Sequence, residues 1–387
     1  MVISFYSNYI NHYTLPLIEE LNAIEGCKTY FVETDVLPLS MQKVGFREYD
    51  NRDFFIRYWA DDSSKRKAEE LALSADVMVV GSRCMWLKYK RLHQNKLTFD
   101  MSERPLKKGM LNLLSPTILK NHLCYHLFFR NKPLFMLCTS AYTAFDEQKL
   151  HAYKGRCYKM GYTPRIIKLD VPKTIESRRG GKTRLFWCAR FIKWKHPELA
   201  LELAERLVAN HYDFELNMVG SGEELGHIQA MINERNLSDY VHLLGNYPND
   251  EVLELMAQHH IFLFTSDKNE GWGVVLNEAM GRACCPVVSH LVGSVPFLIK
   301  HKENGMVFKS GNIDSLTNSV RYLLDNPNEM ERMSACAYSD ISENWSPQVV
   351  ARRLYRLSDE FLKGNYSFSF EDGPLSVASV ISEMYHY

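Results

Sequence analysis

Short apolar runs alternate with longer stretches whose apolar residues recur every three or four positions along the chain. Such short runs predict buried strands, and the periodic stretches predict helices. In the first half we expect strands at 2–7, 28–34 and 132–140, a helix at 15–24, and a helix followed by a strand within 65–82. In the second half we expect strands at 183–191, 214–222, 241–247, 261–266 and 285–290, and helices at 196–209, 222–236, 249–259 and 346–362. This alternation is typical of parallel sheets covered by helices.

The alternation breaks around 171–183, where the sequence is polar and contains glycines. A chain of 387 residues also exceeds what one hydrophobic core usually supports. We therefore predict two α/β, Rossmann-like domains that face each other across a cleft, with ligands at the carboxyl ends of the strands. The expected parts are an N-terminal domain over 1–170, a linker over 171–183, a C-terminal domain over 184–345, and over 346–387 a helix that crosses back to the N-terminal domain, followed by a tail.

The composition limits the classes of protein to which the chain can belong. No apolar run approaches the eighteen residues of a membrane-spanning helix, and the N-terminus lacks the basic start of a secretory signal. The nine cysteines include no C-x-x-C pair, and no His/Cys spacing fits a metal site. We therefore expect reduced thiols, no metal, no cofactor and a cytoplasmic location.

Charge is unevenly distributed although the formal net charge is zero. Between Arg83 and Lys132 eleven Lys or Arg residues stand against Asp100 and Glu103, a net charge of +9. This excess predicts an anionic ligand or a membrane surface, and the alternative is an ordinary solvated face. Aromatic residues within the stretch belong either to the core or to a membrane-facing surface. No nucleic-acid-binding motif accompanies the basic residues.

Two glutamates flank a glycine-rich turn in "DKNEGWGVVLNEAM", immediately after an apolar run. A helix that starts around Gly273 would direct backbone N–H groups at a phosphate. Carboxylates accept hydrogen bonds from hydroxyls, so Glu270 suits a sugar and Glu278 a ribose diol. The alternative is that Glu270 only interacts favourably with the helix dipole and that Glu278 is exposed to solvent.

Basic residues follow the first strand of the second half. Arg190 and Lys195 lie at the crossing from strand to helix, where they would neutralise a diphosphate leaving group. The next strand ends in Gly220 and Gly222, which permit close backbone approach. Leu225 breaks the G-x-G-x-x-G spacing, which argues against an NAD enzyme.

An ordered series of motifs covers roughly residues 184–310: "ARFIKWKH", "NMVGSGEE", "VHLLGNY", "NEGWGVVLNEAM", "SHLVGSVPFLI" and "ENGMVF". This series resembles the C-terminal domain of the retaining, nucleotide-sugar-dependent glycosyltransferases of family 4, a group 1 family with the GT-B fold. The first half matches more loosely, through "YSNYINHYTLPL", "SERPLKKG" and "TSAYTAFDEQKL".

The resemblance implies a donor site in the C-terminal domain. In the family, the basic pair holds the diphosphate, the first glutamate contacts the transferred sugar, and the second contacts the ribose. The implied donor-binding residues are Arg190, Lys195, Gly220, Gly222, Leu244, Glu270, Gly271, Trp272, Gly273, Val274 and Glu278. The sequence departs from the family pattern at His196, where glycine is usual, at Arg282 and Ala283, and at Phe297.

The acceptor is expected in the first domain. Asn11 and His12 follow the first strand, and Ser140 and Tyr142 end a later one. His12 is a candidate catalytic residue, or else a solvated or buried histidine. Glu103 is either an acceptor-site group or a salt-bridge partner of a neighbouring cation.

Together these features predict a hexosyltransferase that moves a sugar from a UDP- or GDP-sugar to a hydroxyl of a glycan or lipid-linked acceptor. The resemblance implies that the anomeric configuration is retained. Its expected catalytic residues are Glu270, Arg190, Lys195 and His12. The resemblance suggests cell-surface polysaccharide synthesis at the inner face of the membrane, without nucleic acid. An epimerase or phosphorylase on the same fold, or a non-catalytic scaffold, remains an alternative.

Overall fold

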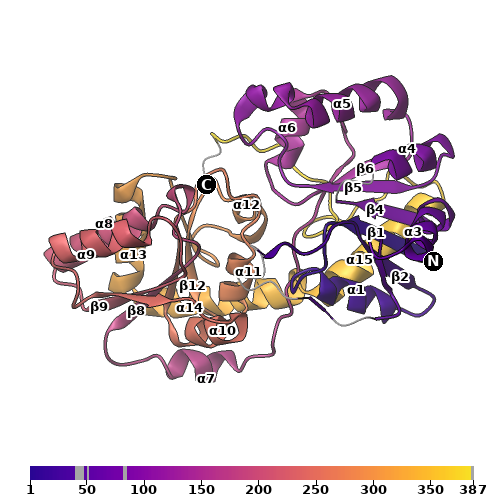
Figure 1. Cartoon of the computed structure of the whole chain (residues 1–387). Coiled ribbons are helices and arrows are strands. Elements are labelled where there is room, and N and C mark those ends of the chain that lie inside the picture. The colour runs from indigo at the N-terminus through magenta and orange to yellow at the C-terminus, as the bar shows by residue number, and fades with distance from the viewer. Residues whose placement is uncertain (40–47, 50–51, 82–84, 385–387) are drawn as a thin grey trace. The chain divides into compact units, whose positions relative to one another are not determined.

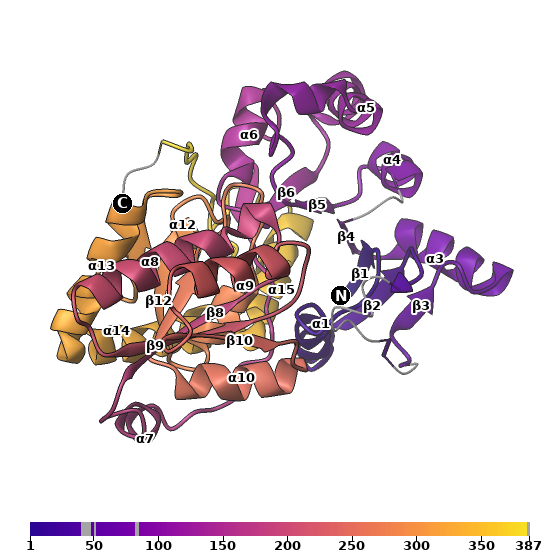
Figure 2. The same ribbon diagram turned by 60° about the vertical axis from the view of Figure 1, so that its left-hand side comes forward.

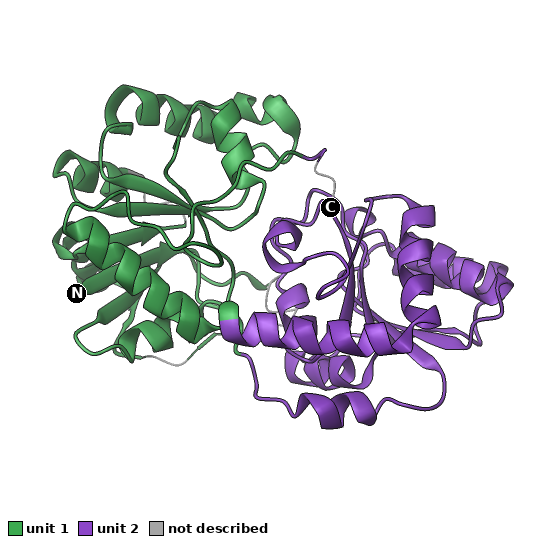
Figure 3. Ribbon diagram, turned by 180° about the vertical axis from the view of Figure 1, so that it is seen from behind, with its two compact units in different colours: residues 1–165, 344–382 green, residues 166–343, 383–387 purple. Residues whose placement is uncertain are grey.

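A computed structural model describes the chain except residues 40–47, 50–51, 82–84 and 385–387. The chain forms two compact units (Figure 3). Unit 1 comprises residues 1–165 and 344–382, and unit 2 comprises residues 166–343 and 383–387. Each unit is built around its own parallel sheet.

The sheet of unit 1 has seven parallel strands in the order β3-β2-β1-β4-β5-β6-β7 (Figure 1). These are β1 (Val2–Ser7), β2 (Lys28–Glu33), β3 (Phe55–Arg57), β4 (Val77–Val80), β5 (Thr98–Ser102), β6 (Leu134–Cys138) and β7 (Cys157–Lys159). Its helical segments are α1 (Leu15–Asn22), α3 (Asp62–Ser74), α4 (Met85–His93), η1 (Gly109–Leu114), α5 (Pro116–Cys124), η2 (Tyr125–Phe129), α6 (Thr143–Lys149) and α15 (Pro347–Leu362).

Alternate residues of the central strands pack on opposite faces of this sheet, as strand geometry requires. Ile3 and Phe5 of β1 lie in one core cluster with residues of α1 and α15. Tyr6 of β1 lies in another cluster with Ala68 and Ala72 of α3. The C-terminal helix α15 is therefore an integral part of the first core.

The sheet of unit 2 has six parallel strands in the order β10-β9-β8-β11-β12-β13 (Figure 2). These are β8 (Thr183–Cys188), β9 (Phe214–Val219), β10 (Val241–Gly245), β11 (Ile261–Phe264), β12 (Cys285–Ser289) and β13 (Met306–Phe308). Its helical segments are α7 (Val171–Glu176), η3 (Lys193–Lys195), α8 (Pro197–Ala209), α9 (Leu225–Glu234), α10 (Asn249–Gln258), α11 (Val275–Met280), α12 (Val295–Leu298), α13 (Ile313–Asp325), α14 (Pro327–Ser339) and η4 (Asp340–Asn344).

Both sheets place their first strand between their second and fourth strands. The strand order therefore reverses between β1 and β4 in unit 1, and between β8 and β11 in unit 2. Doubly wound sheets bind ligands at the carboxyl ends of the strands beside this switch point. The predicted fold class, two Rossmann-like α/β domains, is confirmed.

The segment predicted to be a linker, 171–183, differs from that expectation because much of it is folded. Helix α7 is capped by the Asp170 side chain, which accepts a hydrogen bond of 3.2 Å from the backbone N–H of Lys173. Arg178 is buried and donates to the carbonyls of Ala257, Arg282 and Ala283. These bonds join the segment to unit 2, and the units divide after residue 165 rather than 170.

The stretch from Arg83 to Lys132 is less of a basic surface than its net charge suggests. Arg91 is fully buried and donates to four backbone carbonyls, from Ala72, Ala75, Asp76 and Leu97. Lys88 and Arg104 are also buried and form ion pairs with Asp100 and Asp146. Buried cations require such partners, so these three hold the fold together and do not attract external anions. Arg83 lies outside the described residues.

Candidate functional site

The loops after β8 and β11, at the switch point of unit 2, bring two predicted site residues into contact. The Lys195 ammonium forms an ion pair with Oε2 of Glu270. Both residues are buried, with 8% and 9% of their surface exposed. The Ser266 hydroxyl donates a 3.1 Å hydrogen bond to the same carboxylate oxygen. A buried, paired and hydrogen-bonded carboxylate at a ligand-binding edge is a functional-site candidate.

Lys195 is positioned by a chain of hydrogen bonds across the sheet. Its backbone carbonyl accepts a 2.6 Å bond from the Thr265 hydroxyl, which accepts a 2.9 Å bond from the Trp187 indole N–H. Trp187 lies in β8, and Thr265 directly follows β11. These hydrogen bonds connect the two loops close to the points where they leave the sheet.

The Trp194 ring lies close to both residues that are predicted to bind the diphosphate, Arg190 and Lys195. The Lys195 ammonium lies 4.5 Å from the centroid of the Trp194 ring, and the Arg190 guanidinium carbon lies 5.9 Å from it. Arg190 is exposed, whereas Lys195 is buried. An approaching anion would therefore meet Arg190 first and would then compete with Glu270 for Lys195.

Gly220 and Gly222 fit closely against the loop that carries Arg190. Their φ angles are +137° and +157°, in the region that favours glycine. A Cβ atom at Gly220 would lie 1.9 Å from the carbonyl oxygen of Ala189, and one at Gly222 would lie 2.2 Å from that of Phe191. The two glycines thus support the site, and their predicted contact with the donor stays a prediction.

The glycine turn at 270–274 is held by its own backbone and by the core. The carbonyls of Glu270 and Trp272 accept bonds of 3.2 and 3.3 Å from the N–H groups of Gly293 and Ser294. The Trp272 side chain is only 1% exposed and donates to Asn277. Any ligand contact by this part of the turn would therefore be made by the backbone. Helix α11 begins at Val275, two residues later than expected.

Gly273 allows the turn to approach β11. Its φ angle is +82°, and a Cβ atom there would lie 2.4 Å from the Phe264 ring. Its neighbours Gly271 and Val274 belong to the same turn, and their predicted donor contact stays a prediction.

Glu278 lies in α11 and is only 8% exposed, so the alternative of an exposed surface carboxylate is wrong. Its Oε1 accepts a 2.9 Å hydrogen bond from the side chain of Asn249, at the start of α10. Leu244, another predicted donor-binding residue, lies in strand β10 and is half-buried. It precedes Gly245, whose carbonyl accepts a 2.8 Å bond from the N–H of Gly220.

His196 shows why glycine suits its position. The residue has a φ of +51° and a ψ of +54°, a left-handed conformation that glycine adopts without strain. Its ring lies 2.7 Å from a carboxylate oxygen of Glu198 and 3.5 Å from one of Asp267. The hydrogen bond to Glu198 is the main reason that the pKa of His196 is raised above its ordinary value. The two carboxylates thus hold a side chain that the strained backbone must accommodate.

The acceptor-side residues in unit 1 do not form one cluster of accessible polar groups. The Asn11 side chain accepts bonds from the N–H groups of Tyr13 and Thr14, at 3.3 and 3.0 Å, so it shapes the turn into α1. His12 is half-buried with its ring edge-on to Tyr13. Its predicted role stays a prediction.

The remaining acceptor-side residues are buried or paired. Ser140 and Tyr142 are fully buried, so their contact with an acceptor would have to be indirect. Glu103 forms an ion pair with Lys107, as the alternative interpretation of that residue predicted.

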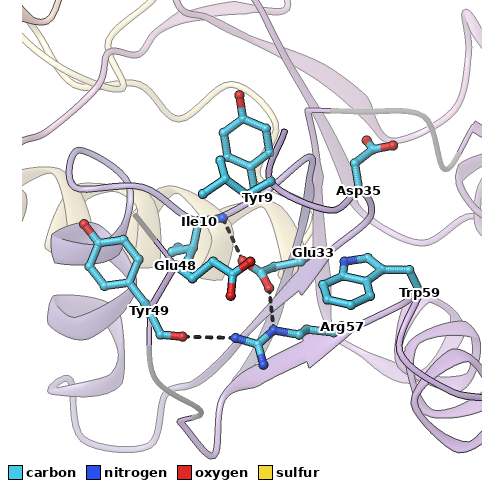
Figure 4. A pocket seen from close by; sticks show the side chains of 9 residues that line it. Tyr9, Ile10, Glu33, Asp35, Glu48, Tyr49, Arg57 and Trp59 are labelled. Carbon is cyan, nitrogen blue, oxygen red and sulfur yellow. Dashed lines mark hydrogen bonds and ion pairs between the residues drawn. The ribbon is translucent and has the colours of Figure 1, made fainter. Parts of the chain in front are cut away.

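Figure 4 shows a small pocket close to the chain after β1. Glu33 lines it and accepts hydrogen bonds from the N–H of Ile10 at 3.0 Å and from Arg57 at 3.1 Å. The cavity has a volume of about 10 Å³, which is room for about one water molecule. It is too small for a sugar.

Three side chains that shape the candidate site of unit 2 were not predicted from the sequence: Trp194, Ser266 and Asn249. Only Trp194 had a local signal, because it lies between the basic residues in "KWK". Over the described parts of the chain, no three His, Cys, Asp or Glu residues gather as metal ligands. No helix within the same parts is long and apolar enough to cross a membrane.

Residues 173–340 match the family model "Glycosyl transferases group 1". This part of the chain is a group 1 glycosyltransferase domain. The match contains Arg190, Lys195, Glu270 and Glu278, and the predicted family is confirmed at this level. The narrower assignment to family 4 and the retaining stereochemistry stay predictions.

Relatives of the group 1 glycosyltransferase domain support this assignment. The chain is 28% identical over 180 residues to N-acetyl-alpha-D-glucosaminyl L-malate synthase of Bacillus anthracis, covering 46% of each chain. It is 24% identical over 208 residues to the amylovoran biosynthesis glycosyltransferase AmsK of Erwinia amylovora, covering 52% of this chain and 50% of that one. The chain thus spans about half the length of these curated relatives.

A solved structure of HepE from Anabaena in complex with UDP resembles most of the chain. Its TM-score is 0.70 at 14% identity, and the match covers 92% of this chain and 99% of that one. At this identity the likeness establishes the fold alone. It agrees with the predicted GT-B fold of two Rossmann-like domains.

Proposed function

We propose that the protein is a retaining glycosyltransferase that moves a sugar from a UDP- or GDP-sugar to a hydroxyl of a glycan or lipid-linked acceptor. The observation that carries the proposal is the buried Lys195–Glu270 pair, beside exposed Arg190, at the switch point of a group 1 glycosyltransferase domain. HepE was solved in complex with UDP, and AmsK is an amylovoran biosynthesis glycosyltransferase. The UDP bound by HepE agrees with a nucleotide sugar donor, and the name of AmsK agrees with polysaccharide synthesis.

The electrostatics of the site suit the reaction. Transfer breaks the bond between the anomeric carbon and the diphosphate, so negative charge develops on the diphosphate and positive charge on the sugar. Arg190 and Lys195 would stabilise the negative charge, and preorganised charges of this kind usually make the largest catalytic contribution. Because these two cations would face the charge of the diphosphate, we propose that the reaction needs no further cofactor.

Glu270 is arranged to hold the sugar. Among the described residues, the donors that reach its carboxylate, Lys195 and Ser266, both meet Oε2. Oε1 would accept a sugar hydroxyl, in a charge-assisted bond that contributes about 1.5–3 kcal/mol. Glu278 would hold the ribose, and His12 and Asn11 of unit 1 would serve the acceptor.

A donor screen tests the proposed reaction. The protein would be mixed with UDP-glucose, UDP-N-acetylglucosamine or GDP-mannose, each with and without EDTA. One donor should raise the unfolding temperature, because a ligand at 100 times its Kd stabilises the folded state by about 2.7 kcal/mol. Release of free UDP or GDP should then depend on an added glycan acceptor and persist in EDTA. An isomerised nucleotide sugar would favour an epimerase, and neither binding nor release would favour a scaffold.

We also propose that unit 1 contacts an anionic membrane surface. Large apolar side chains on η1, α5 and η2 are 43–78% exposed and are here named the leucine face: Met110, Leu111, Leu114, Leu119, Leu123, Leu127 and Phe128. The sequence has no Asp or Glu between Glu103 and Asp146, whereas Lys107, Lys108, Lys120, Arg130 and Lys132 lie there. An exposed apolar face among cations favours insertion at the surface of an anionic bilayer.

Sedimentation with vesicles tests this contact. The protein should sediment with phosphatidylglycerol vesicles and not with vesicles of phosphatidylcholine alone, and added salt should weaken binding. Leu123→Asp and Leu127→Asp should each lower the bound fraction several-fold. Leu362→Asp changes an exposed leucine of α15, outside the leucine face, and should have no effect. Equal binding by all three variants would contradict the proposal.

A further inference from the structure

Unit 1 contains a cavity of about 470 Å³ between its sheet and α5. Its floor includes Val80, Asp100 and Met136, from β4, β5 and β6. Its outer wall includes Ile118 of α5 and Tyr125 of η2. Figures 1 and 2 both place α5 above β5 and β6. Pockets of 300–1,000 Å³ are typical of small-molecule sites.

Helix α5 covers this cavity and does not pack into a core. None of its nine residues, all within the described part of the chain, is buried. Ile118, Asn121 and His122 line the cavity, whereas Leu119 and Leu123 are exposed on the leucine face. An apolar helix gains most of its stability from a buried face, so a ligand beneath α5 would supply the missing contact.

The inner end of the cavity is polar. Lys88 lies 3.0 Å from both carboxylate oxygens of Asp100, and the Tyr153 hydroxyl also donates to Asp100. Glu147 lines the same end and is only 7% exposed. No donor among the described residues reaches its carboxyl group. Burial, with the nearby negative charges, raises the pKa of Glu147 to about 8, so this group is largely neutral at pH 7.

A second polar group in the cavity wall also lacks a partner. Nδ1 of His122 is buried and has no hydrogen bond to any described residue. Buried polar groups are normally hydrogen-bonded, and leaving one unsatisfied costs about 1–3 kcal/mol. Nδ1 has almost no accessible surface through which a ligand could reach it, so Glu147 is the group that indicates a ligand with neutral hydrogen-bonding groups such as hydroxyls.

The rest of the lining combines apolar and aromatic residues with polar ones, namely Ser102, Arg104, Lys107, Asn112 and Asn121. Arg104 and Lys107 form ion pairs with Asp146 and Glu103. Tyr89 stacks on Phe129, with ring centroids 5.0 Å apart, and both residues line the cavity with Leu150 and Ala152. Aromatic rings beside hydroxyl-binding groups suit a sugar ring, which has both apolar and polar faces. The apolar wall continues to Ile118, next to exposed Leu119.

We propose that this cavity binds the acceptor as a glycolipid, a sugar joined to a hydrocarbon chain. The sugar lies at the inner end, where it hydrogen-bonds Glu147. The chain passes along Ile118 under α5 and leaves beside the leucine face. The inference rests on the proposed function, because it takes the bound glycolipid to be the acceptor of transfer.

Calorimetric titration with alkyl glycosides tests the pocket without any donor. Decyl glucoside and decyl maltoside, below their micelle concentrations, would be titrated into the full chain, alongside glucose, maltose and decyl phosphate. At least one decyl glycoside should bind. Its octyl analogue should bind roughly tenfold more weakly, because two fewer methylenes are buried. The free sugars and decyl phosphate should bind at least tenfold more weakly. Binding of decyl phosphate as tight as that of the glycosides, or no binding of either glycoside, would overturn the inference.

Adjacent positions of α5 offer a matched pair of variants. Ile118→Trp would extend into the path of the hydrocarbon chain and should weaken glycoside binding at least tenfold, whereas Leu119→Trp changes only the exposed face and should stay within twofold of the parent. Because neither residue is buried, both variants should keep the parent's unfolding temperature. Glu147→Leu should weaken binding more than Glu147→Gln, which keeps a hydrogen-bonding group. Equal losses in the two tryptophan variants would contradict the inference.

The outcomes separate this inference from the proposed function. Glycoside binding with no nucleotide release from any donor would retain the pocket and refute the transferase. Transfer to a glycan in a protein that binds no alkyl glycoside would retain the transferase and refute the pocket.

Discussion

Replacing Lys195 by methionine is expected to lower kcat for sugar transfer by about 10²–10³, the usual effect of removing one group that stabilises charge in a transition state. Methionine keeps an apolar stem against Trp194 and Phe264, whose ring centroids lie 4.5 and 5.8 Å from the Lys195 ammonium. The substitution therefore removes charge with little loss of packing. It also leaves the buried Glu270 carboxylate without its cation, so stability should fall as well.

A double variant separates catalysis from folding. In Lys195→Met/Glu270→Gln both buried charges are gone, so the unfolding temperature should recover relative to Lys195→Met. The loss in kcat should remain, because the diphosphate still lacks its cation. Lys193→Met is the matched control, since it removes an exposed lysine two positions away. If the double variant regained the parent's kcat, or if Lys193→Met lost as much activity, the assignment of Lys195 would be wrong.

Much of unit 2 could be predicted because its determinants are local in the sequence. The apolar runs predicted β8, β9, β10, β11 and β12. Most candidate residues lie at a strand end or in the loop that follows it, whereas Glu278 lies further on, in α11. In a doubly wound sheet those ends meet at one edge, so the sequence alone predicts that Lys195 and Glu270 lie near each other. Their direct ion pair could not, because it depends on how two loops 75 residues apart fold against each other.

Strand β5 and the buried ion pairs of unit 1 could not be predicted from the sequence. Strand β5 was not predicted, because Asp100 interrupts its apolar pattern. That aspartate is buried and paired with Lys88, which was instead counted toward a basic surface. Charge counted along a sequence does not distinguish a cation facing solvent from one paired inside the fold. The buried pairs of Lys88 and Arg104 and the carbonyl contacts of Arg91 become visible only with the tertiary structure.

The cavity under α5 is a further feature that no local sequence pattern predicts. Its lining comes from β4, α4, β5 and the chain after it, η1, α5, η2, β6, and α6 with the chain after it, spread over residues 80–153. Glu147 lies in a short helix with no unusual sequence around it. Only its burial and the lack of a donor from the described residues distinguish it from a surface glutamate.

Replacing Gly222 by alanine is expected to destabilise unit 2 by about 3 kcal/mol. The new Cβ would lie 2.2 Å from the carbonyl oxygen of Phe191 and 2.7 and 2.8 Å from its carbonyl carbon and nitrogen, and backbone atoms cannot rotate away as a flexible side chain could. Overpacking costs about 1–3 kcal/mol, and a non-glycine residue with positive φ adds about 1–2 kcal/mol. The loop that must shift carries Arg190, so donor binding should weaken in the same variant.

Gly226→Ala, four positions further along, provides a control with the opposite expected sign. Gly226 lies in α9, its φ is not positive, and a Cβ atom there would meet nothing within 4 Å. Alanine should stabilise the helix by up to about 1 kcal/mol, because it loses less backbone entropy on folding than glycine does. Chemical denaturation of both variants, with titration of the donor that the screen identifies, measures stability and binding together. If Gly222→Ala were as stable as Gly226→Ala, the loop would not be held by close backbone contact. If it were unstable but bound the donor normally, the support that Gly222 gives to the Arg190 loop would be unrelated to the site.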